Sequence, residues 1–249
     1  RNTMQIFHST LVWILSFVWM ALLSIATAIL IPFFSYRRVH LYVPAAGFSL
    51  IPLFTLSPLH TTYDPKFDPK RLSVFCFNHV NILDAFVTSA TIPHAFCGMM
   101  NAWQFYIPFY GWLMWMSKGI AVHRRSGLSI QEEITREAKR RKEIGFSILV
   151  FPEAHRTRDG KVHTFHKGTF LMARDAGYPV VPVAVRGSFA VNRRGSYLFK
   201  PGNIDVHFGP QFETAGLSDA AMGDLARQFQ HTIAEFVDGK SVTDQKEVA

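Results

Sequence analysis

The sequence predicts an α/β domain with a mixed, largely parallel sheet flanked by helices, behind an N-terminal membrane-anchoring helical segment. After residue 70, short apolar runs rich in β-branched and aromatic residues alternate with helix-length amphipathic segments, which is the pattern of strands joined by crossover helices. The chain has 249 residues, 49% of them hydrophobic. That is enough for one such domain and an additional element.

The N-terminal segment is uncharged over the length of a membrane span. No Asp, Glu, Lys or Arg occurs between Gln5 and Tyr36, and the apolar run exceeds the roughly 20 residues that cross a hydrocarbon core. A cleaved signal peptide has a shorter apolar region, so this alternative is disfavoured. The segment therefore predicts a helix in a membrane.

A second uncharged stretch, residues 39–60, contains three prolines and a glycine and indicates an interrupted or interfacial helix. Two complete spans would place Arg37 and Arg38 on the far side from the rest of the chain, against the positive-inside tendency. We therefore expect residues 1–60 to form one span or a shallow hairpin in one leaflet. Residues 61–71, which are polar and contain two prolines, predict a linker, and residues 72–249 a catalytic domain.

Within the catalytic domain, the periodicity predicts elements in a regular order. Strands are expected at 71–77, 119–123, 147–151, 179–185 and 203–209, and helices from Asp84 to before Pro93 and at 127–144, 167–175 and 218–237.

The net charge and the cysteines limit the classes of binding partner and the redox state that we expect. A net charge of +8 indicates an anionic partner, such as nucleic acid, an acidic membrane or a phosphorylated small molecule. Cys76 and Cys97 lie in no C-x-x-C pair, which favours two reduced, buried thiols over a disulfide between them.

The stretch "NHVNILD" places His79 at the end of a predicted strand and Asp84 five residues later. On one continuous helix this spacing would turn the side chains about 140° apart. If residues 78–81 form a turn and the helix begins near Ile82, however, the carboxylate can reach the imidazole and orient it as a general base. Taken alone, a structural histidine and a helix-capping aspartate would explain the pair more often. The chain has no G-x-S-x-G elbow, so we expect the nucleophile to be a substrate hydroxyl.

Basic residues gather after two other predicted strands. Residues 149–170 contain a cluster of charged residues that suggests a phosphate clamp, although a solvated basic loop is equally consistent: Glu153, Arg156, Arg158, Lys161 and Lys167. Arg124 and Arg125 follow the strand at 119–123, where a surface turn is an equal alternative. A zinc site built from Glu153 and the histidines at 155, 163 and 166 matches no standard spacing.

Together these segments resemble the glycerolipid acyltransferase family, whose best-known members make phosphatidic acid from lysophosphatidic acid. "NHVNILD" resembles the N-H-x-x-x-x-D motif, "FPEAHRTR" the F-P-E-G-T-R-S block, "VVPVAV" the V-P-V block and "KGIAVHRR" the G-x-x-F-I-x-R block. The four motifs stand in the family's order over about residues 70–215. The two N-terminal apolar segments are similar to membrane-anchoring helices of bacterial relatives.

The resemblance implies a role for each matched residue. His79 and Asp84 take the catalytic places, and Glu153 and Arg156 those associated with the acceptor's glycerol phosphate. Arg124 or Arg125 supplies another phosphate contact, and Pro182 lies near the acyl-binding part. We add Lys167 as a phosphate-binding residue. Ala154 and His155 replace the family's Gly and Thr, so the acyl-transfer chemistry is better supported than the acceptor, which could be another lysophospholipid or a lyso-aminolipid.

The resulting hypothesis is direct acyl transfer from acyl-CoA or acyl carrier protein to a lysophospholipid hydroxyl, without a metal, cofactor or covalent acyl-enzyme. It places the protein at a membrane, in a bacterium the inner membrane, with the catalytic domain on the cytoplasmic face. Because both substrates have apolar tails, we expect an apolar groove. Candidate lining residues are Phe75, Phe77, Phe86, Trp103, Phe105 and Trp112.

Two other classes remain. A membrane-tethered hydrolase could use the same pair on water. A binding module for nucleic acid or an anionic surface would explain the basic segment 136–142, but the chain contains no known nucleic-acid motif.

Overall fold

The computed structural model describes residues 2–40, 43, 45–123 and 128–239, and among these seven strands form one mixed sheet. The strand order is β1-β7-β6-β2-β5-β3-β4, and only the β6–β7 pair is antiparallel. The strands are β1 (Leu59–Tyr63), β2 (Val74–Phe77), β3 (Phe96–Asn101), β4 (Ile120–Val122), β5 (Ser147–Val150), β6 (Val180–Arg186) and β7 (Ile204–Phe208). The predicted mixed, largely parallel sheet is therefore confirmed.

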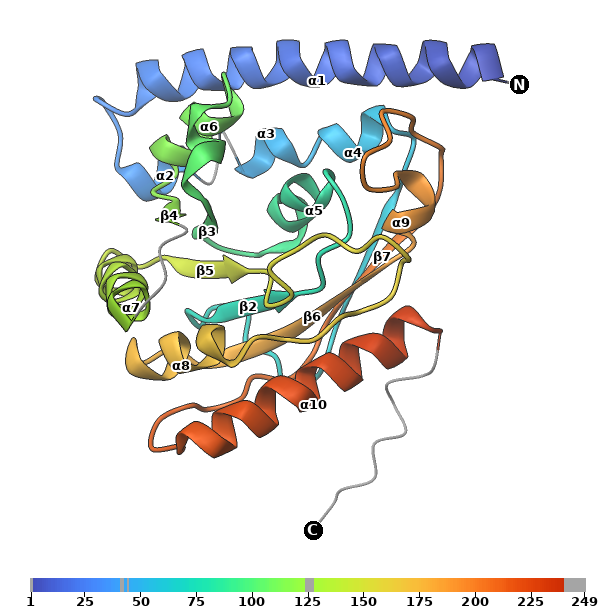
Figure 1. The fold of residues 1–249 in the computed structure, drawn as a ribbon. Helices are drawn as coiled ribbons and strands as arrows, with labels where there is room; N and C mark the ends of the chain where they lie inside the picture. The colour runs from blue at the N-terminus through green and yellow to red at the C-terminus, as the bar shows by residue number, and fades with distance from the viewer. Residues whose placement is uncertain (1, 41–42, 44, 124–127, 240–249) are drawn as a thin grey trace.

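Helices cover both faces of the sheet (Figure 1). One face carries α7 (Leu128–Glu143), α8 (Lys167–Asp175) and α10 (Asp219–Val237). The other carries α5 (Asp84–Thr91), α6 (Tyr110–Met116) and the short helices α3 (Ala46–Phe48) and α4 (Ile51–Phe54). The remaining short elements are α2 (Tyr36–His40), the 3-10 helix η2 (Ala102–Tyr106) and α9 (Ser188–Val191). β2 and β5 are fully buried, which explains their unbroken apolar sequences.

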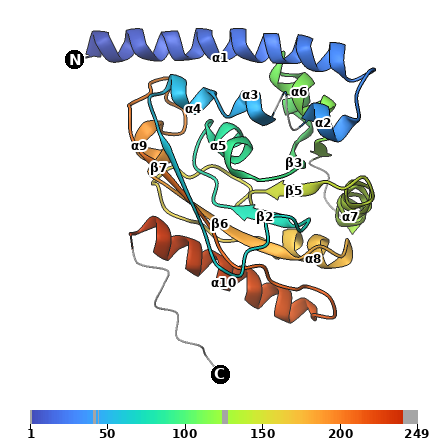
Figure 2. The same cartoon turned by 180° about the vertical axis from the view of Figure 1, so that it is seen from behind.

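Helix α1 (Asn2–Leu30) extends along the outside of the α3–α6 layer, as the front and back views both show (Figures 1 and 2). It is long and apolar enough to cross a membrane, and one third of its most apolar window is buried against the protein. Its polar groups bind loops of the domain: Gln5 Nε2 donates to the Phe199 carbonyl (3.3 Å) and Trp13 Nε1 to the Tyr197 carbonyl (2.9 Å). Further along the helix, Trp19 Nε1 donates to the Gly47 carbonyl (2.7 Å).

The elements agree with most of the sequence predictions. Helices α8 and α10 begin and end within a residue of the expected positions, and the stretch 39–60 is interrupted as expected. Helix α5 begins at Asp84 and ends at Thr91, before Pro93, as the periodicity predicts; the start near Ile82, considered for the contact with His79, is two residues too early. Strands β1 and β3 were not predicted, and the expected linker 61–71 begins inside β1, which pairs with β7. Cys76 and Cys97 are free and buried, so no disulfide joins them.

Candidate active site

The turn between β2 and α5 brings His79 and Asp84 together. The distance between His79 Nδ1 and Asp84 Oδ2 is 2.7 Å. The same oxygen accepts hydrogen bonds from the backbone N–H groups of Val80 (2.7 Å) and Asn81 (3.1 Å). The carboxylate folds back on the turn because it begins α5 rather than lying within it. With Nδ1 bound to Asp84, the other ring nitrogen, Nε2, is free to accept a proton.

Residues 151–157 hold His79 in place from the neighbouring strand β5. The ring of Phe151 stacks on the imidazole, with centroids 4.0 Å apart and planes 16° apart. The His79 N–H donates to Glu153 Oε1 (2.7 Å), and the Thr157 N–H donates to the His79 carbonyl (2.8 Å). The ring plane and the backbone of the candidate base are therefore both fixed.

Glu153 is buried, and both of its carboxylate oxygens bind backbone groups. Oε2 accepts a hydrogen bond from the N–H of His163 (2.8 Å), as Oε1 does from His79. Burial raises the pKa of Glu153, although the two N–H groups oppose that shift. In this structure Glu153 contacts the catalytic turn, and it does not line the cavity described below.

Two asparagines, whose roles the sequence analysis did not identify, tie the catalytic turn to β6 and α9. Asn78 exchanges a pair of hydrogen bonds with the backbone of Val185 (2.9 and 2.8 Å). The amide nitrogen of Asn81 donates to the Ser188 (2.7 Å) and Asn192 (2.8 Å) carbonyls. An asparagine within a predicted turn is only a weak signal, because turns favour this residue for local reasons.

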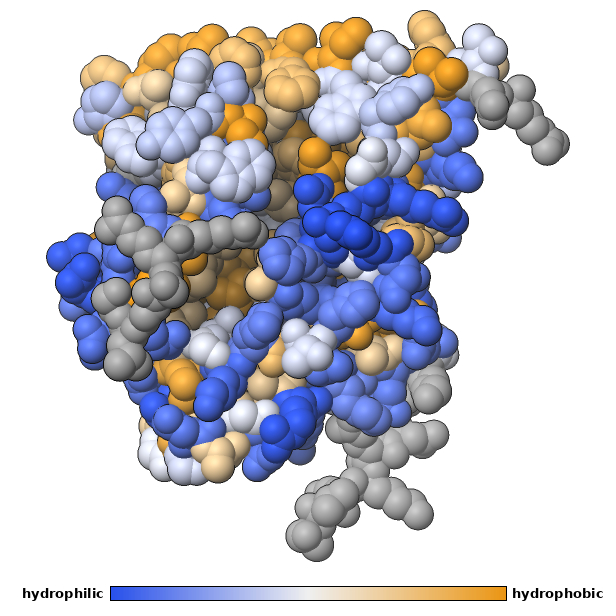
Figure 3. Space-filling view, in the orientation of Figure 1, coloured by the Kyte–Doolittle hydropathy of each residue, from blue (hydrophilic) through white to orange (hydrophobic). Residues whose placement is uncertain are grey.

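The His79–Asp84 pair opens into a mainly apolar cavity of about 550 Å³. Its walls come from α1, α5, α6, η2, β3 and the loop after β5, and Figure 3 shows the surface hollowed, with an apolar interior. Of the six aromatic residues expected in the groove, Phe86 and Trp103 line the cavity, while Phe75 and Phe77 belong to the core. Phe105 and Trp112 do not line it. The cavity wall formed by α1 was not predicted; it includes Val12, Trp13, Ser16, Phe17 and Met20.

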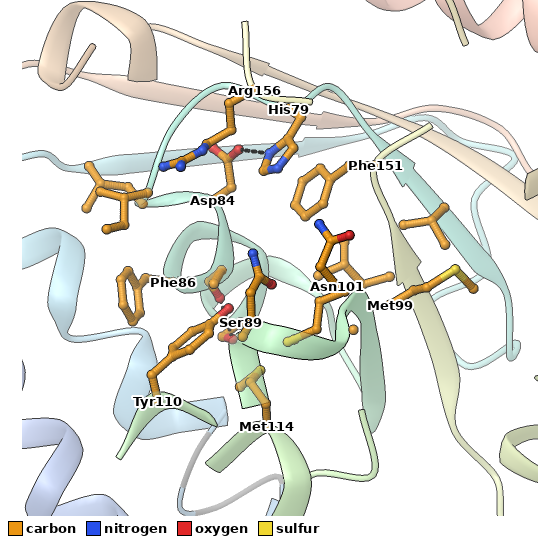
Figure 4. Close-up of a pocket in the computed structure, with 18 of the residues that line it drawn as sticks. His79, Asp84, Phe86, Ser89, Met99, Asn101, Tyr110, Met114, Phe151 and Arg156 are labelled. Atoms are coloured by element: carbon orange, nitrogen blue, oxygen red, sulfur yellow. Dashed lines mark hydrogen bonds and ion pairs between the residues drawn. The ribbon is translucent and has the colours of Figure 1, made fainter. Parts of the chain in front are cut away.

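Polar side chains also line this cavity (Figure 4). Arg156 points into it from the loop after β5, and Asp84 and His79 lie at the same end. Tyr110 lies deeper, near Ser89 of α5, and burial raises its pKa to about 12, so its hydroxyl remains protonated.

The other predicted site residues lie elsewhere. Lys167 is exposed at the start of α8, and its neighbours His166 and Gly168 line the cavity while it does not. Pro182 lies buried within β6, paired with Cys76 of β2, and does not reach the cavity. Arg124 and Arg125 fall outside the described residues.

The loop after β5 also bears on the zinc alternative. Among the described residues, no group of three or more His, Cys, Asp and Glu side chains has the arrangement of a metal site. His163 instead pairs with Asp159 (3.1 Å).

Ala154, in the place where the resembling family has Gly, adopts a positive φ of 58°. Because a Cβ is disfavoured in this region, the position explains the family's Gly in physical terms.

The family sequence model described as Acyltransferase matches residues 61–186, slightly more than half of the chain. The chain belongs to the acyltransferase family. A 1-acyl-sn-glycerol-3-phosphate acyltransferase of Haemophilus influenzae is 31% identical over 179 residues, which are 71% of this acyltransferase and 72% of the relative.

Other relatives match over a shorter range. Proteins with the same name from Limnanthes douglasii and Pseudomonas aeruginosa are 26% and 28% identical over 58% and 52% of this acyltransferase. The chain spans about half the length of these two relatives. The crystal structure of the 1-acyl-sn-glycerophosphate acyltransferase PlsC from Thermotoga maritima superposes with a TM-score of 0.79 over 99% of both chains. At 18% identity, this match establishes the shared fold.

Proposed function

We propose that this acyltransferase moves an acyl chain from acyl-CoA or acyl carrier protein to the free hydroxyl of lysophosphatidic acid, giving phosphatidic acid. The observation that carries the proposal is the 2.7 Å contact between His79 Nδ1 and Asp84 Oδ2 at one end of an apolar cavity. A base oriented by a carboxylate can activate a hydroxyl. An apolar cavity suits a substrate with a hydrocarbon tail.

In the proposed reaction, His79 Nε2 accepts the proton of the acceptor hydroxyl while its oxygen attacks the thioester carbonyl. The tetrahedral intermediate then expels the thiolate. The imidazolium gives the thiolate the proton that it took from the acceptor hydroxyl, and the thiolate leaves as a thiol. Asp84 stabilises the imidazolium through Nδ1 and holds the ring orientation. The ester bond forms and the thioester bond breaks without a covalent bond to the protein.

Arg156 is the candidate for binding the acceptor phosphate, because it is the positively charged arginine that faces this end of the cavity among the described residues. The acceptor head group is the less specific part of the proposal. Relatives with 1-acylglycerol-3-phosphate in their names support lysophosphatidic acid. The replacement of the family's Gly and Thr by Ala154 and His155, beside Arg156, favours testing other lysophospholipids and lyso-aminolipids as well.

We propose further that α1 binds the membrane along its length. Its outward face exposes large apolar side chains, among them Met4, Phe7, Ile14, Val18, Leu22, Ile25 and Ile29. In Figure 3 the apolar surface gathers over α1, and most of the remaining surface of that view is hydrophilic. Because α1 is bound to the domain at several points, we infer that it lies within one leaflet and delivers lipid substrates to the cavity. We propose that this membrane is a bacterial inner membrane, because similar acyltransferases occur in Pseudomonas aeruginosa and Haemophilus influenzae, and that the cavity faces the cytoplasm, where acyl-CoA and acyl carrier protein thioesters are available.

Purified protein offered a panel of lysolipids with acyl-CoA and acyl carrier protein thioesters, with products identified by mass spectrometry, tests the reaction and the acceptor. His79→Ala should lower turnover by roughly 10²–10⁴-fold, the scale of a general base. The matched control is His231→Ala, because His231 is exposed on α10 and far from the cavity lining. Full activity of the His79→Ala variant would refute the mechanism.

A further inference from the structure

Two buried polar side chains line the cavity without a hydrogen-bond partner. His40, the last residue of α2, is 5% exposed, and neither of its ring nitrogens has a partner among the described residues. Ser117, which follows α6, is 4% exposed, and its hydroxyl is likewise unpartnered. Both residues line the same cavity as the catalytic pair. Unpaired polar groups in an apolar site are costly and call for a ligand that pairs them.

The two residues lie on the same side of the sheet. The ring of His40 packs edge-on against Phe96, the first residue of β3, with centroids 5.5 Å apart. Ser117 lies between α6 and β4, three residues before Ile120, the first residue of β4. Because β4 runs parallel to β3, with Ile120 opposite Met99, the turn that contains Ser117 lies toward the amino ends of these strands. His40 and Ser117 therefore both lie toward the amino end of β3.

The catalytic pair lies at the other end of the strands. His79 follows the carboxyl end of β2, and β2, β5 and β3 run parallel. Every residue of β3 except Cys97 lines the cavity, from Phe96 at the amino end to Asn101 at the carboxyl end, so the cavity follows this strand. A strand of this length spans about 17–20 Å. An acyl chain whose reacting end is at His79 would thus bring its far end toward His40 and Ser117.

The chemistry of this distal end suits a neutral hydroxyl group. Burial lowers the pKa of His40 to about 4, so at neutral pH one ring nitrogen donates and the other accepts. The Ser117 hydroxyl can do both, and rotation about its χ1, or about χ2 of His40, can turn these atoms toward a bound chain. Among the described lining residues, the charged ones, Asp84 and Arg156, lie at the catalytic end, so the distal end offers no counter-charge to a carboxylate.

We propose that the cavity selects an acyl chain that carries a hydroxyl group near its far end, bound by His40 and Ser117. This inference rests on the proposed acyl transfer and specifies its lipid. The polar atoms of both side chains are already buried from water, so a plain hydrocarbon chain would leave them unpaired, whereas a hydroxyl group could pair them once they turn toward it. Sites built in this way discriminate against the analogue that lacks the hydrogen-bonding group.

The chain can belong to the thioester donor or to the monoacyl acceptor, and two assay arms distinguish them. In the first, donors with a straight saturated chain and with the same chain bearing a terminal hydroxyl compete for one lysophosphatidic acid. In the second, lysophosphatidic acids with these two chains compete for one donor. We expect kcat/KM to favour the hydroxylated chain at least tenfold in one arm. Displacement of a fluorescent fatty acid by the two free acids gives a readout independent of turnover.

Substitutions test whether His40 and Ser117 cause the preference for the hydroxylated chain. Ser117→Ala and His40→Phe should each reduce the preference, in turnover and in displacement, and together bring the ratio close to one. Thr27→Val is the matched control, because Thr27 Oγ1 is also buried and unpartnered but Thr27 does not line the cavity. If His40→Phe does not fold, Ser117→Ala alone decides. Equal use and equal displacement by both chains would overturn the inference while leaving acyl transfer intact, and absence of any transfer would instead refute the proposed function.

Discussion

The two ends of the cavity differ in how far their polar side chains are paired. At the end that contains His79 and Asp84, Asp84 Oδ2 and both oxygens of Glu153 accept hydrogen bonds from backbone N–H groups, and Asp84 Oδ1 is the one carboxylate oxygen of these two residues that has no partner among the described residues. At the distal end, His40 and Ser117 have no partner among the described residues. The comparison teaches that the fold fixes polar groups that must hold one geometry during reaction. Polar groups without partners belong where a ligand completes the structure.

Among the substitutions that test this difference between the two ends, Asp84→Asn should have the largest effect, and that effect should be on kcat. An amide in this place cannot accept from His79 Nδ1 in the same way and favours the wrong tautomer, so we expect kcat to fall roughly 10²–10⁴-fold. Steady-state kinetics with the lysophosphatidic acid assay measures this. Asp224→Asn, on the exposed face of α10, serves as control. An Asp84→Asn variant with normal kcat would show that the ordered catalytic end is not needed for turnover.

Arg156→Ala should act on binding. Loss of a charge-assisted hydrogen bond to the acceptor phosphate costs about 1.5–3 kcal/mol, so KM for the acceptor should rise roughly ten- to hundredfold with a smaller change in kcat. Arg158→Ala is the control, because Arg158 lies in the same loop, is exposed and does not line the cavity. A fall in kcat at unchanged KM would assign Arg156 to the chemical step instead.

Glu153→Gln tests how much the hydrogen bonds of Glu153 to the backbone of His79 and His163 stabilise the protein. Gln keeps one acceptor oxygen where Glu153 binds two N–H groups, so the free energy of unfolding should fall by about 1–3 kcal/mol. Denaturant unfolding measures it. Glu143→Gln, at an exposed position of α7, should change it by less than about 0.5 kcal/mol.

The same variant gives a pH signature. Burial raises the pKa of Glu153 above 4.5, so its ionisation opposes folding. The contribution of the protonated side chain to the free energy of unfolding is complete below pH 4.5 and is lost as the pH rises through the raised pKa of Glu153. The stability deficit of Glu153→Gln should therefore be largest in acid and shrink with rising pH. A deficit that grows with pH would mean that the N–H groups outweigh burial.

The smallest expected effect is on the free energy of unfolding, and its sign is opposite to that expected for Glu153→Gln. Ser117→Ala removes a buried hydroxyl without a partner, so it should leave the free energy of unfolding unchanged or raise it by up to about 1 kcal/mol. Ser188→Ala is the contrasting variant, because the Ser188 hydroxyl accepts a hydrogen bond from Asn81 (2.9 Å) and its loss should destabilise the protein. Destabilisation by Ser117→Ala equal to that by Ser188→Ala would remove the difference between the two ends.

The sequence predicted the sheet and the catalytic turn because both depend on local signals. Strands β2, β5 and β6 are almost entirely buried and rich in β-branched or aromatic residues, and Asp84 lies in the first turn of its helix. Strands β1 and β3 were missed because LHTTY is a polar edge strand and FCGMMN has no β-branched residue. Pairing with β7 and β5, rather than propensity, makes them strands.

The distal end of the cavity could not be predicted for a different reason. His40 and Ser117 are separated by 76 intervening residues. The packing of α2 brings His40 to Phe96, and the parallel β3–β4 pair places the turn that contains Ser117 on the same side of the sheet. No spacing rule connects such residues. The roles of Asn81 and Glu153 could not be predicted for the same reason, since Ser188 and His79, with which they form hydrogen bonds, lie far from them in the sequence.

The position of α1 has a practical consequence for handling the protein. Since Val12, Trp13 and Met20 form part of the wall around the lipid, a shortened polypeptide beginning after residue 30 would present an open trough to solvent. Such a polypeptide could lose activity even when mixed with fully dispersed substrates. Its failure would report the loss of one wall of the cavity and not merely poor recruitment to vesicles.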